Sequence, residues 1–269
     1  MPRLISFFLL LLTFCGLTNM PPIAVNAQTP PAHHIYLPLV RTPAPDLSGQ
    51  WLGYLIQPGK SFAFSLDLQQ SGSSIQGSSQ AETDDFYAVW SLEGSIDGAQ
   101  LSLTELDILE AEEPPGWRWC IKDMQLQFAV DMGVPTLTGT WAESGCNAGE
   151  LYLQAATGPF PTMQGMWEGT ISQGDTNYTM QLEVDQDTAF VWGDALITRG
   201  NDTGVLAFSG YVAGSHVQLE DQFVRETTGL NWCLKTMVLR YKGNTLTGFW
   251  TAPGCLPGTL SLTKRMKLP

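Results

Sequence analysis

The chain has 269 residues and a formal net charge of −13 at pH 7, which argues against nucleic acid and anionic lipid surfaces as partners. Charged residues make up only 14% of the chain and glycine occurs 27 times, a composition typical of exported all-β proteins rather than helical cytosolic ones. Beyond residue 27 no apolar run is long enough to span a bilayer, so we expect no transmembrane segment.

Residues 1–27 have the features of a secretory signal peptide. Arg3 provides a short basic start, residues 5–12 form an almost continuous apolar run, and residues 25–27 (Val-Asn-Ala) fit the small-x-small cleavage pattern. The alternative is a lipoprotein signal lipidated at Cys15, but Phe14 stands where such signals need a small residue. We therefore expect a secreted, extracellular protein, and association with the cell surface stays open.

Residues 28–46 are rich in proline and are expected to form an extended linker. They include His33 and His34, which could bind a metal. Two adjacent histidines without further ligands are more often solvated linker residues, because a metal site needs several ligands at suitable spacing. We therefore expect neither a metal nor a cofactor.

The rest of the chain is an internal repeat. Residues 49–53 (Gly-Gln-Trp-Leu-Gly) return as residues 165–169 (Gly-Met-Trp-Glu-Gly), and residues 137–141 (Leu-Thr-Gly-Thr-Trp) return as residues 246–250 (Leu-Thr-Gly-Phe-Trp). Positions kept in both copies can thus be separated from positions that drifted. The expected organisation is a first repeat at 47–155, a junction at 156–162, a second repeat at 163–264 and a tail at 265–269.

Each repeat shows the period-two alternation of one-sided β-strands. Phe62, Phe64 and Leu66, for example, alternate with small or polar residues. Eight such strands antiparallel to their neighbours hide their edges best as a closed up-and-down barrel. The sequence predicts an all-β tandem of two eight-stranded barrels, with β-sandwiches as the alternative. The strands expected in the first copy are 49–57, 62–70, 74–81, 87–96, 100–107, 118–130, 136–143 and 149–154.

Once the signal peptide is removed, four cysteines remain, two at matching places in each copy. Four cysteines allow three pairings. Pairing within each copy, Cys120 with Cys146 and Cys233 with Cys255, is the simplest, because each repeat could then fold alone. A zinc site is disfavoured, since it needs close Cys-x-x-Cys or Cys/His spacing.

The Gly-x-Trp at the head of each copy, Gly49-Gln50-Trp51 and Gly165-Met166-Trp167, resembles the start of lipocalin and avidin-like barrels. The resemblance implies an eight-stranded barrel that binds a small apolar or biotin-like ligand inside. In lipocalins this tryptophan packs beneath an arginine of the last strand. Lys264 approximates that role in the second copy, whereas the first copy has Gln154-Ala155 there, and no avidin-like polar set can be matched.

Five tryptophans are candidates for contact with a partner. The alternation of the strands points four of them into the barrels: Trp51, Trp141, Trp167 and Trp250. They either line a ligand cavity or fill the barrels as core. Trp192 has outward parity, which suits stacking on a protein or a glycan.

A charged pair recurs in both copies. Lys122 and Glu105 of the first copy, and Lys235 and Asp221 of the second, all have inward parity on neighbouring strands. Each pair is either a polar anchor for a ligand or an ion pair that closes the end of its barrel.

No catalytic motif is present, and Asp84-Asp85, the one tempting carboxylate pair, is not kept in the second copy. We therefore expect a secreted, non-enzymatic, lipocalin-like protein that captures a small apolar ligand in its barrel. The alternative is an extracellular module with filled barrels that binds a protein or a glycan, and an extracellular enzyme is a third hypothesis.

Overall fold

The computed structural model describes residues 44–58, 60–83, 86–116, 118–143, 145–229 and 232–265. Residues 42–269 form one compact unit, and the description below concerns this unit alone. The predicted signal peptide, Cys15, the histidine pair of the linker and Asp84-Asp85 all lie outside the described residues. Within the described ranges, no helix has the length and apolar composition needed to cross a membrane.

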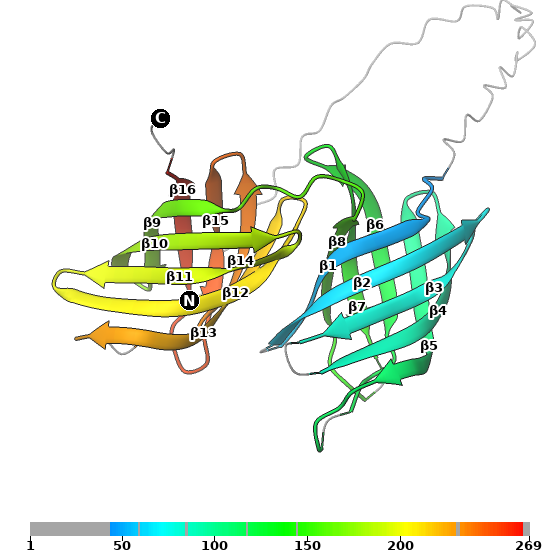
Figure 1. Ribbon diagram of the computed structural model, residues 1–269, viewed down its shortest axis with the longest axis horizontal. Coiled ribbons are helices and arrows are strands. Elements are labelled where there is room, and N and C mark those ends of the chain that lie inside the picture. Colours follow the sequence, from blue (N-terminus) through cyan, green and yellow to red (C-terminus); the bar gives the residue numbers. More distant parts are fainter. Residues whose placement is uncertain are drawn as a thin grey trace, which may run out of the picture. The chain divides into compact units, whose positions relative to one another are not determined.

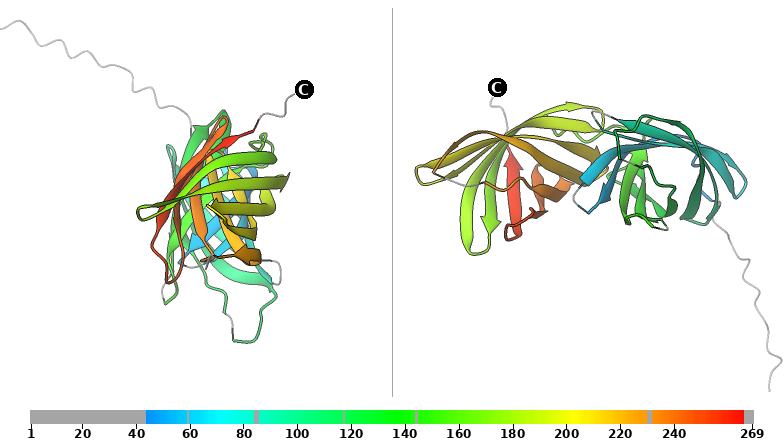
Figure 2. Two further views of the ribbon diagram at one scale, coloured as in Figure 1. Left: turned by 90° about the vertical axis from the view of Figure 1, so that its left-hand side faces the viewer. Right: turned by 90° about the horizontal axis from the view of Figure 1, so that it is seen from below.

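The unit is all-β and consists of two closed eight-stranded antiparallel barrels in tandem, as predicted; the β-sandwich alternative is not supported. In Figures 1 and 2 the strands of each sheet curl round until the last lies beside the first. The first barrel contains β1 (Gly49–Gln57), β2 (Lys60–Ser71), β3 (Ser74–Glu82), β4 (Tyr87–Asp97), β5 (Gln100–Ala111), β6 (Asp123–Asp131), β7 (Val134–Ala142) and β8 (Gly149–Ala155). The second contains β9 (Gly165–Gln173), β10 (Thr176–Asp187), β11 (Phe190–Arg199), β12 (Asp202–Ala213), β13 (His216–Thr228), β14 (Thr236–Lys242), β15 (Thr245–Thr251) and β16 (Gly258–Lys264).

Closure explains the second glycine of the repeated opening motif. β1 pairs with β8 from Trp51 opposite Ala155 to Ile56 opposite Glu150. A Cβ added at Gly53 would lie 2.0 Å from the carbonyl oxygen of Tyr152, and one added at Gly169 would lie 2.0 Å from that of Ser261. Only glycine lets the backbones approach this closely where each barrel closes.

One end of each barrel is filled by the tryptophan of the Gly-x-Trp motif. Trp51 Nε1 donates to the carbonyl oxygen of Leu47 at 2.9 Å, and Trp167 Nε1 donates to that of Met163 at 2.8 Å. Leu47 and Met163 are themselves fully buried. These two tryptophans therefore pack as core and fix the segment that precedes each barrel.

Two predicted strand limits in the first copy are wrong. β6 begins at Asp123 rather than at 118, because its pairing with β5 starts only at Asp123 opposite Thr104 and residues 118–122 cross the barrel mouth without a strand partner. β5 continues to Ala111 rather than ending at 107, because it stays paired with β4 up to Ala88 opposite Ala111.

Each copy has its own disulfide bond, as predicted. Cys120 joins Cys146 and Cys233 joins Cys255, with Cα atoms 6.6 and 6.5 Å apart. Each bond ties the segment before the sixth strand of its barrel to the loop after the seventh. The disulfide therefore crosses one end of the barrel, which is called the mouth below.

Candidate ligand-binding site

The mouth of the first barrel opens into a cavity of about 420 Å³. Leu55 from the end of β1, Phe62 from the start of β2, Ala81 from the end of β3 and Trp141 from the end of β7 line its walls. Antiparallel strands bring these ends together, since every second link of an up-and-down barrel lies at the same end.

Trp119 covers part of this cavity. Its ring makes edge or tilted contacts with Phe62, Phe86 and Trp90, with ring centroids 5.5–5.8 Å apart. Its Nε1 donates to the carbonyl oxygen of Glu112 at 3.3 Å. The neighbouring disulfide holds residue 120 in place, so the position of Trp119 over the mouth is set on both sides.

The predicted charged pair forms below this cover. Lys122 Nζ lies 3.0 Å from Glu105 Oε2 and also donates to the carbonyl oxygen of Cys120 at 3.2 Å. Ser79 Oγ donates to Glu105 Oε1 at 2.6 Å, and the Lys122 backbone N–H donates to Glu105 Oε2 at 2.9 Å. The ammonium also lies 3.5 Å from the ring centroid of Trp90. Both charged side chains are therefore buried and fully engaged.

Burial dominates the titration of this pair. It raises the pKa of Glu105, although the Lys122 ammonium and the Ser79 hydroxyl oppose the change. It also lowers the pKa of Lys122, against the attraction of the carboxylate. Desolvation thus opposes the attraction between the charges, and removing either partner leaves the other charge buried and unpaired.

The second barrel builds the same pair with two hydrogen bonds fewer, three in place of five. Lys235 Nζ lies 3.0 Å from Asp221 Oδ2 and donates to the carbonyl oxygen of Cys233 at 2.9 Å. Asp221 Oδ1 is buried and has no hydrogen-bond partner among the described residues. Ala195 occupies the position that Ser79 has in the first copy, so the donor hydroxyl is missing.

The mouth of the second barrel is nearly filled. Its hollow, lined by residues that include Tyr178, Trp232 and Trp250, measures only about 20 Å³. Ile197 replaces Ala81, and its larger side chain is fully buried. Gly204 replaces Ala88, and Trp232 packs against it so closely that an added Cβ would lie 2.0 Å from the indole Nε1.

The candidate tryptophans therefore separate into three groups. Trp141 lines the cavity of the first barrel, and Trp250 lines the small hollow of the second. Trp51 and Trp167 pack at the opposite ends, away from both mouths. Trp192 is 38% exposed on the outer surface.

The sequence interpretation missed Trp119, Phe62 and Ala81 as site residues. The period-two pattern indicates only that Phe62 points inward, and no motif of the sequence singles out Trp119 or Ala81. A position-by-position comparison of side-chain volume between the copies could have pointed to Ala81, because the equivalent residue of the second copy is the larger Ile197.

A metal has one geometric candidate among the described residues. Cys120, Cys146 and Glu143 bring ligand atoms within 4.8 Å of one another. Both sulfur atoms are bonded to each other, so neither is a thiolate that could bind a metal.

Comparisons with known proteins name no family. No protein-family model and no curated protein matches the chain. Among solved structures it is similar to a protein of unknown function from the DUF3598 family of Nostoc punctiforme, at 12% identity and a TM-score of 0.29. That match covers 82% of this chain and 96% of the other. A similarity of this size carries no conclusion about fold or function.

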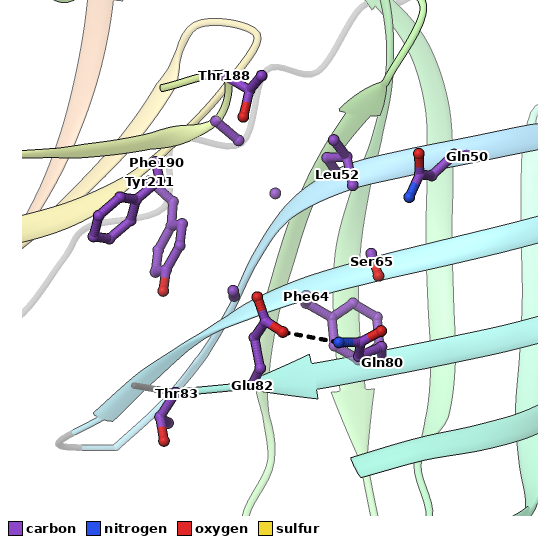
Figure 3. A pocket seen from close by; sticks show the side chains of 13 residues that line it. Gln50, Leu52, Phe64, Ser65, Gln80, Glu82, Thr83, Thr188, Phe190 and Tyr211 are labelled. Atoms are coloured by element: carbon purple, nitrogen blue, oxygen red, sulfur yellow. Dashed lines mark hydrogen bonds between the residues drawn. The ribbon is translucent and has the colours of Figure 1, made fainter. Parts of the chain in front are cut away.

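A further hollow lies on the outer surface, apart from the two mouths. It is a groove of about 470 Å³ whose lining includes Gln80 and Glu82 of β3, Phe190 of β11 and Tyr211 of β12. Figure 3 shows the two aromatic side chains on one side and the hydrogen-bonded Gln80 and Glu82 on the other. Trp192 stacks on Phe190 with ring centroids 5.3 Å apart, so it extends the aromatic side of this groove.

Proposed function

We propose that this chain is a secreted, non-enzymatic binding protein whose first barrel captures a small, largely apolar ligand through its mouth. The observation that carries the proposal is the cavity of about 420 Å³ there, beside a hollow of about 20 Å³ in the second barrel. Sites for small molecules have volumes of about 300–1,000 Å³ and apolar walls with few polar groups.

The build of the site supports this proposal. Leu55, Phe62 and Trp141 offer apolar and aromatic surface, while the one buried charged pair is neutralised internally. A barrel of eight strands is wide enough to hold one small ligand when its inward side chains leave room. The first barrel leaves that room at Ala81, and the second does not at Ile197.

A lipocalin-like relationship is part of the proposal. In the second barrel the Lys264 ammonium lies 5.4 Å from the ring centroid of Trp167 and donates to the carbonyl oxygen of Thr162 at 2.7 Å. A cation of the last strand over the tryptophan of the first strand is the arrangement that the resemblance implies. The expected export is supported by two disulfide bonds, which persist in oxidising compartments.

A second candidate function is binding of a glycan in the outer groove. The aromatic row of Trp192, Phe190 and Tyr211 supports it, since sugar rings stack on aromatic faces. The amide of Gln80 and the carboxylate of Glu82 offer donors and acceptors for hydroxyl groups. Loss of binding to a glycan array in Trp192→Ala, with capture in the barrel unchanged, would assign the glycan to this groove.

The capture proposal is tested by native mass spectrometry of the chain after incubation with a small-molecule extract of its host. We expect a ligand adduct on the wild-type chain and none on Ala81→Ile, which copies the second barrel. Ala129→Ile is the matched control, because it adds the same atoms on the exposed face of β6. Adducts of equal intensity on wild type and Ala81→Ile, or no adduct on either, would contradict capture in the first barrel.

A further inference from the structure

Basic residues are scarce in the first barrel and gather at its mouth. Between residues 47 and 155 the sequence has 15 acidic residues and three basic ones, Lys60, Arg118 and Lys122. Arg118 and Lys122 both line the cavity. The Lys60 ammonium lies 5.1 Å from the ring centroid of Phe62, which lines it as well. A barrel that is otherwise strongly acidic thus has two of its three positive side chains in the lining of its cavity and the third beside a residue of that lining.

Two of these three charges are already engaged by the protein. Lys122 is held by Glu105 and by the carbonyl oxygen of Cys120, which uses the donors of its ammonium group. Lys60 lies over aromatic rings, and its charge opposes the rise that burial causes in the pKa of the Glu220 carboxyl group. Neither side chain is therefore the first choice for a ligand.

Arg118 is the charge that remains for a ligand. Its side chain is exposed at the rim, and it forms no ion pair with any residue that the structure describes. Glu143 is close enough to be influenced by its charge but lies beyond ion-pair distance. Arg118 and Trp119, the aromatic cover, both line the cavity.

We propose that the ligand of the first barrel is an apolar carboxylate whose acid group binds the guanidinium of Arg118 at the mouth. The planar guanidinium can form two parallel hydrogen bonds with a carboxylate, while Leu55, Phe62 and Trp141 hold the apolar body. The inference rests on the proposed function. It applies to the first barrel alone, since the equivalent position of the second copy is Asn231 in the sequence.

The test compares 1-naphthoate with its neutral analogue 1-naphthamide by isothermal titration calorimetry of the full chain. An exposed ion pair should favour naphthoate about fivefold in the wild-type chain. Arg118→Gln should abolish this preference while the affinity for naphthamide stays the same. Arg225→Gln is the matched control, because it removes an exposed arginine of the second barrel, and it should keep the preference.

Each outcome decides a separate question. Equal affinities for the two compounds in wild type, or a preference that persists in Arg118→Gln, would overturn the carboxylate inference and leave capture of apolar ligands in place. Binding of neither compound, or unchanged binding in Ala81→Ile, would overturn the proposed function and the inference with it. A preference for naphthoate that weakens with added salt and is lost in Arg118→Gln supports both.

Discussion

The two barrels have the same frame and differ in what fills their mouths. Both have eight strands, a Gly-x-Trp start, a disulfide and a buried lysine–carboxylate pair, yet their mouth hollows measure about 420 and 20 Å³. The difference comes from substitutions between the copies. The second barrel has the larger Ile197 where the first has Ala81, and it has Gly204 where the first has Ala88, which leaves space for the Trp232 ring. What the repeat keeps is therefore architecture, and the candidate function lies where the copies differ.

The buried charged pairs of the two barrels also differ, in how many hydrogen-bond partners the carboxylate has. Glu105 has the Ser79 hydroxyl as an additional partner, whereas one oxygen of Asp221 is left without a partner among the described residues. The first barrel therefore has the better satisfied pair under the larger cavity, and the second has the less satisfied pair under a filled mouth. The pair closes each barrel whether or not a ligand binds above it.

The largest expected effect is that of breaking a pair. Lys122→Met leaves a buried carboxylate alone and should lower the free energy of unfolding by about 3–5 kcal/mol, as should Lys235→Met in the second barrel. Thermal unfolding followed by circular dichroism measures this, with the exposed Lys242→Met as control. Unchanged melting temperatures in both variants would contradict a structural role of the pairs.

The same variant has a predicted pH dependence. Burial already raises the pKa of Glu105 in the folded state, and loss of Lys122 removes the charge that opposes this rise. A carboxyl group whose folded pKa exceeds its unfolded value favours folding when protonated and loses that contribution as pH rises through the folded pKa. The destabilisation by Lys122→Met should therefore be smaller at pH 5 than at pH 8. Equal destabilisation at both values would contradict this origin.

Removal of either disulfide should lower the free energy of unfolding by a similar amount, but only removal of the first should weaken ligand binding. They span 26 and 22 residues, so loss of either should cost about 3 kcal/mol by loop entropy. Only the double variant Cys120→Ser, Cys146→Ser should also weaken binding of 1-naphthamide, because that bond positions Trp119 over the open cavity. Denaturant unfolding and calorimetry measure the two effects. A similar loss of binding in Cys233→Ser, Cys255→Ser would remove the distinction between the barrels.

The smallest effect tests the unpaired oxygen of the second barrel. Ala195→Ser should supply the donor that Ser79 provides in the first barrel and stabilise the chain by about 1 kcal/mol. Ser79→Ala, the reverse change, should destabilise it by at least as much. Chemical denaturation of both variants gives the comparison, and destabilisation by Ala195→Ser would show that Asp221 has no room for the hydroxyl.

Much of the frame could be predicted from the sequence. The period-two alternation of a strand indicates which way each side chain points, and the repeat indicates which positions of the two copies correspond. Parity on neighbouring strands placed Lys122 beside Glu105, and matching positions in the copies gave the disulfide pairing. The start of β6 could not be predicted, since it depends on where the pairing with β5 begins, at Thr104 opposite Asp123. Aligning the two copies shows that Ala81 is smaller than Ile197, but it does not show whether the difference leaves a cavity. The cavity depends on Ala81, Ala88 and Trp119 together, and alternation reports which way a side chain points but not whether its neighbours leave space.

The central claim is that the first barrel binds in its mouth and the second does not. The most direct measurement is a two-dimensional NMR titration of the tryptophan indole N–H signals of the full chain with 1-naphthamide. Trp119 and Trp141 line the first mouth, and Trp232 and Trp250 line the second. We expect saturable shifts of the first two signals and none of the last two. Equal shifts in both pairs, or shifts confined to the second barrel, would contradict the claim.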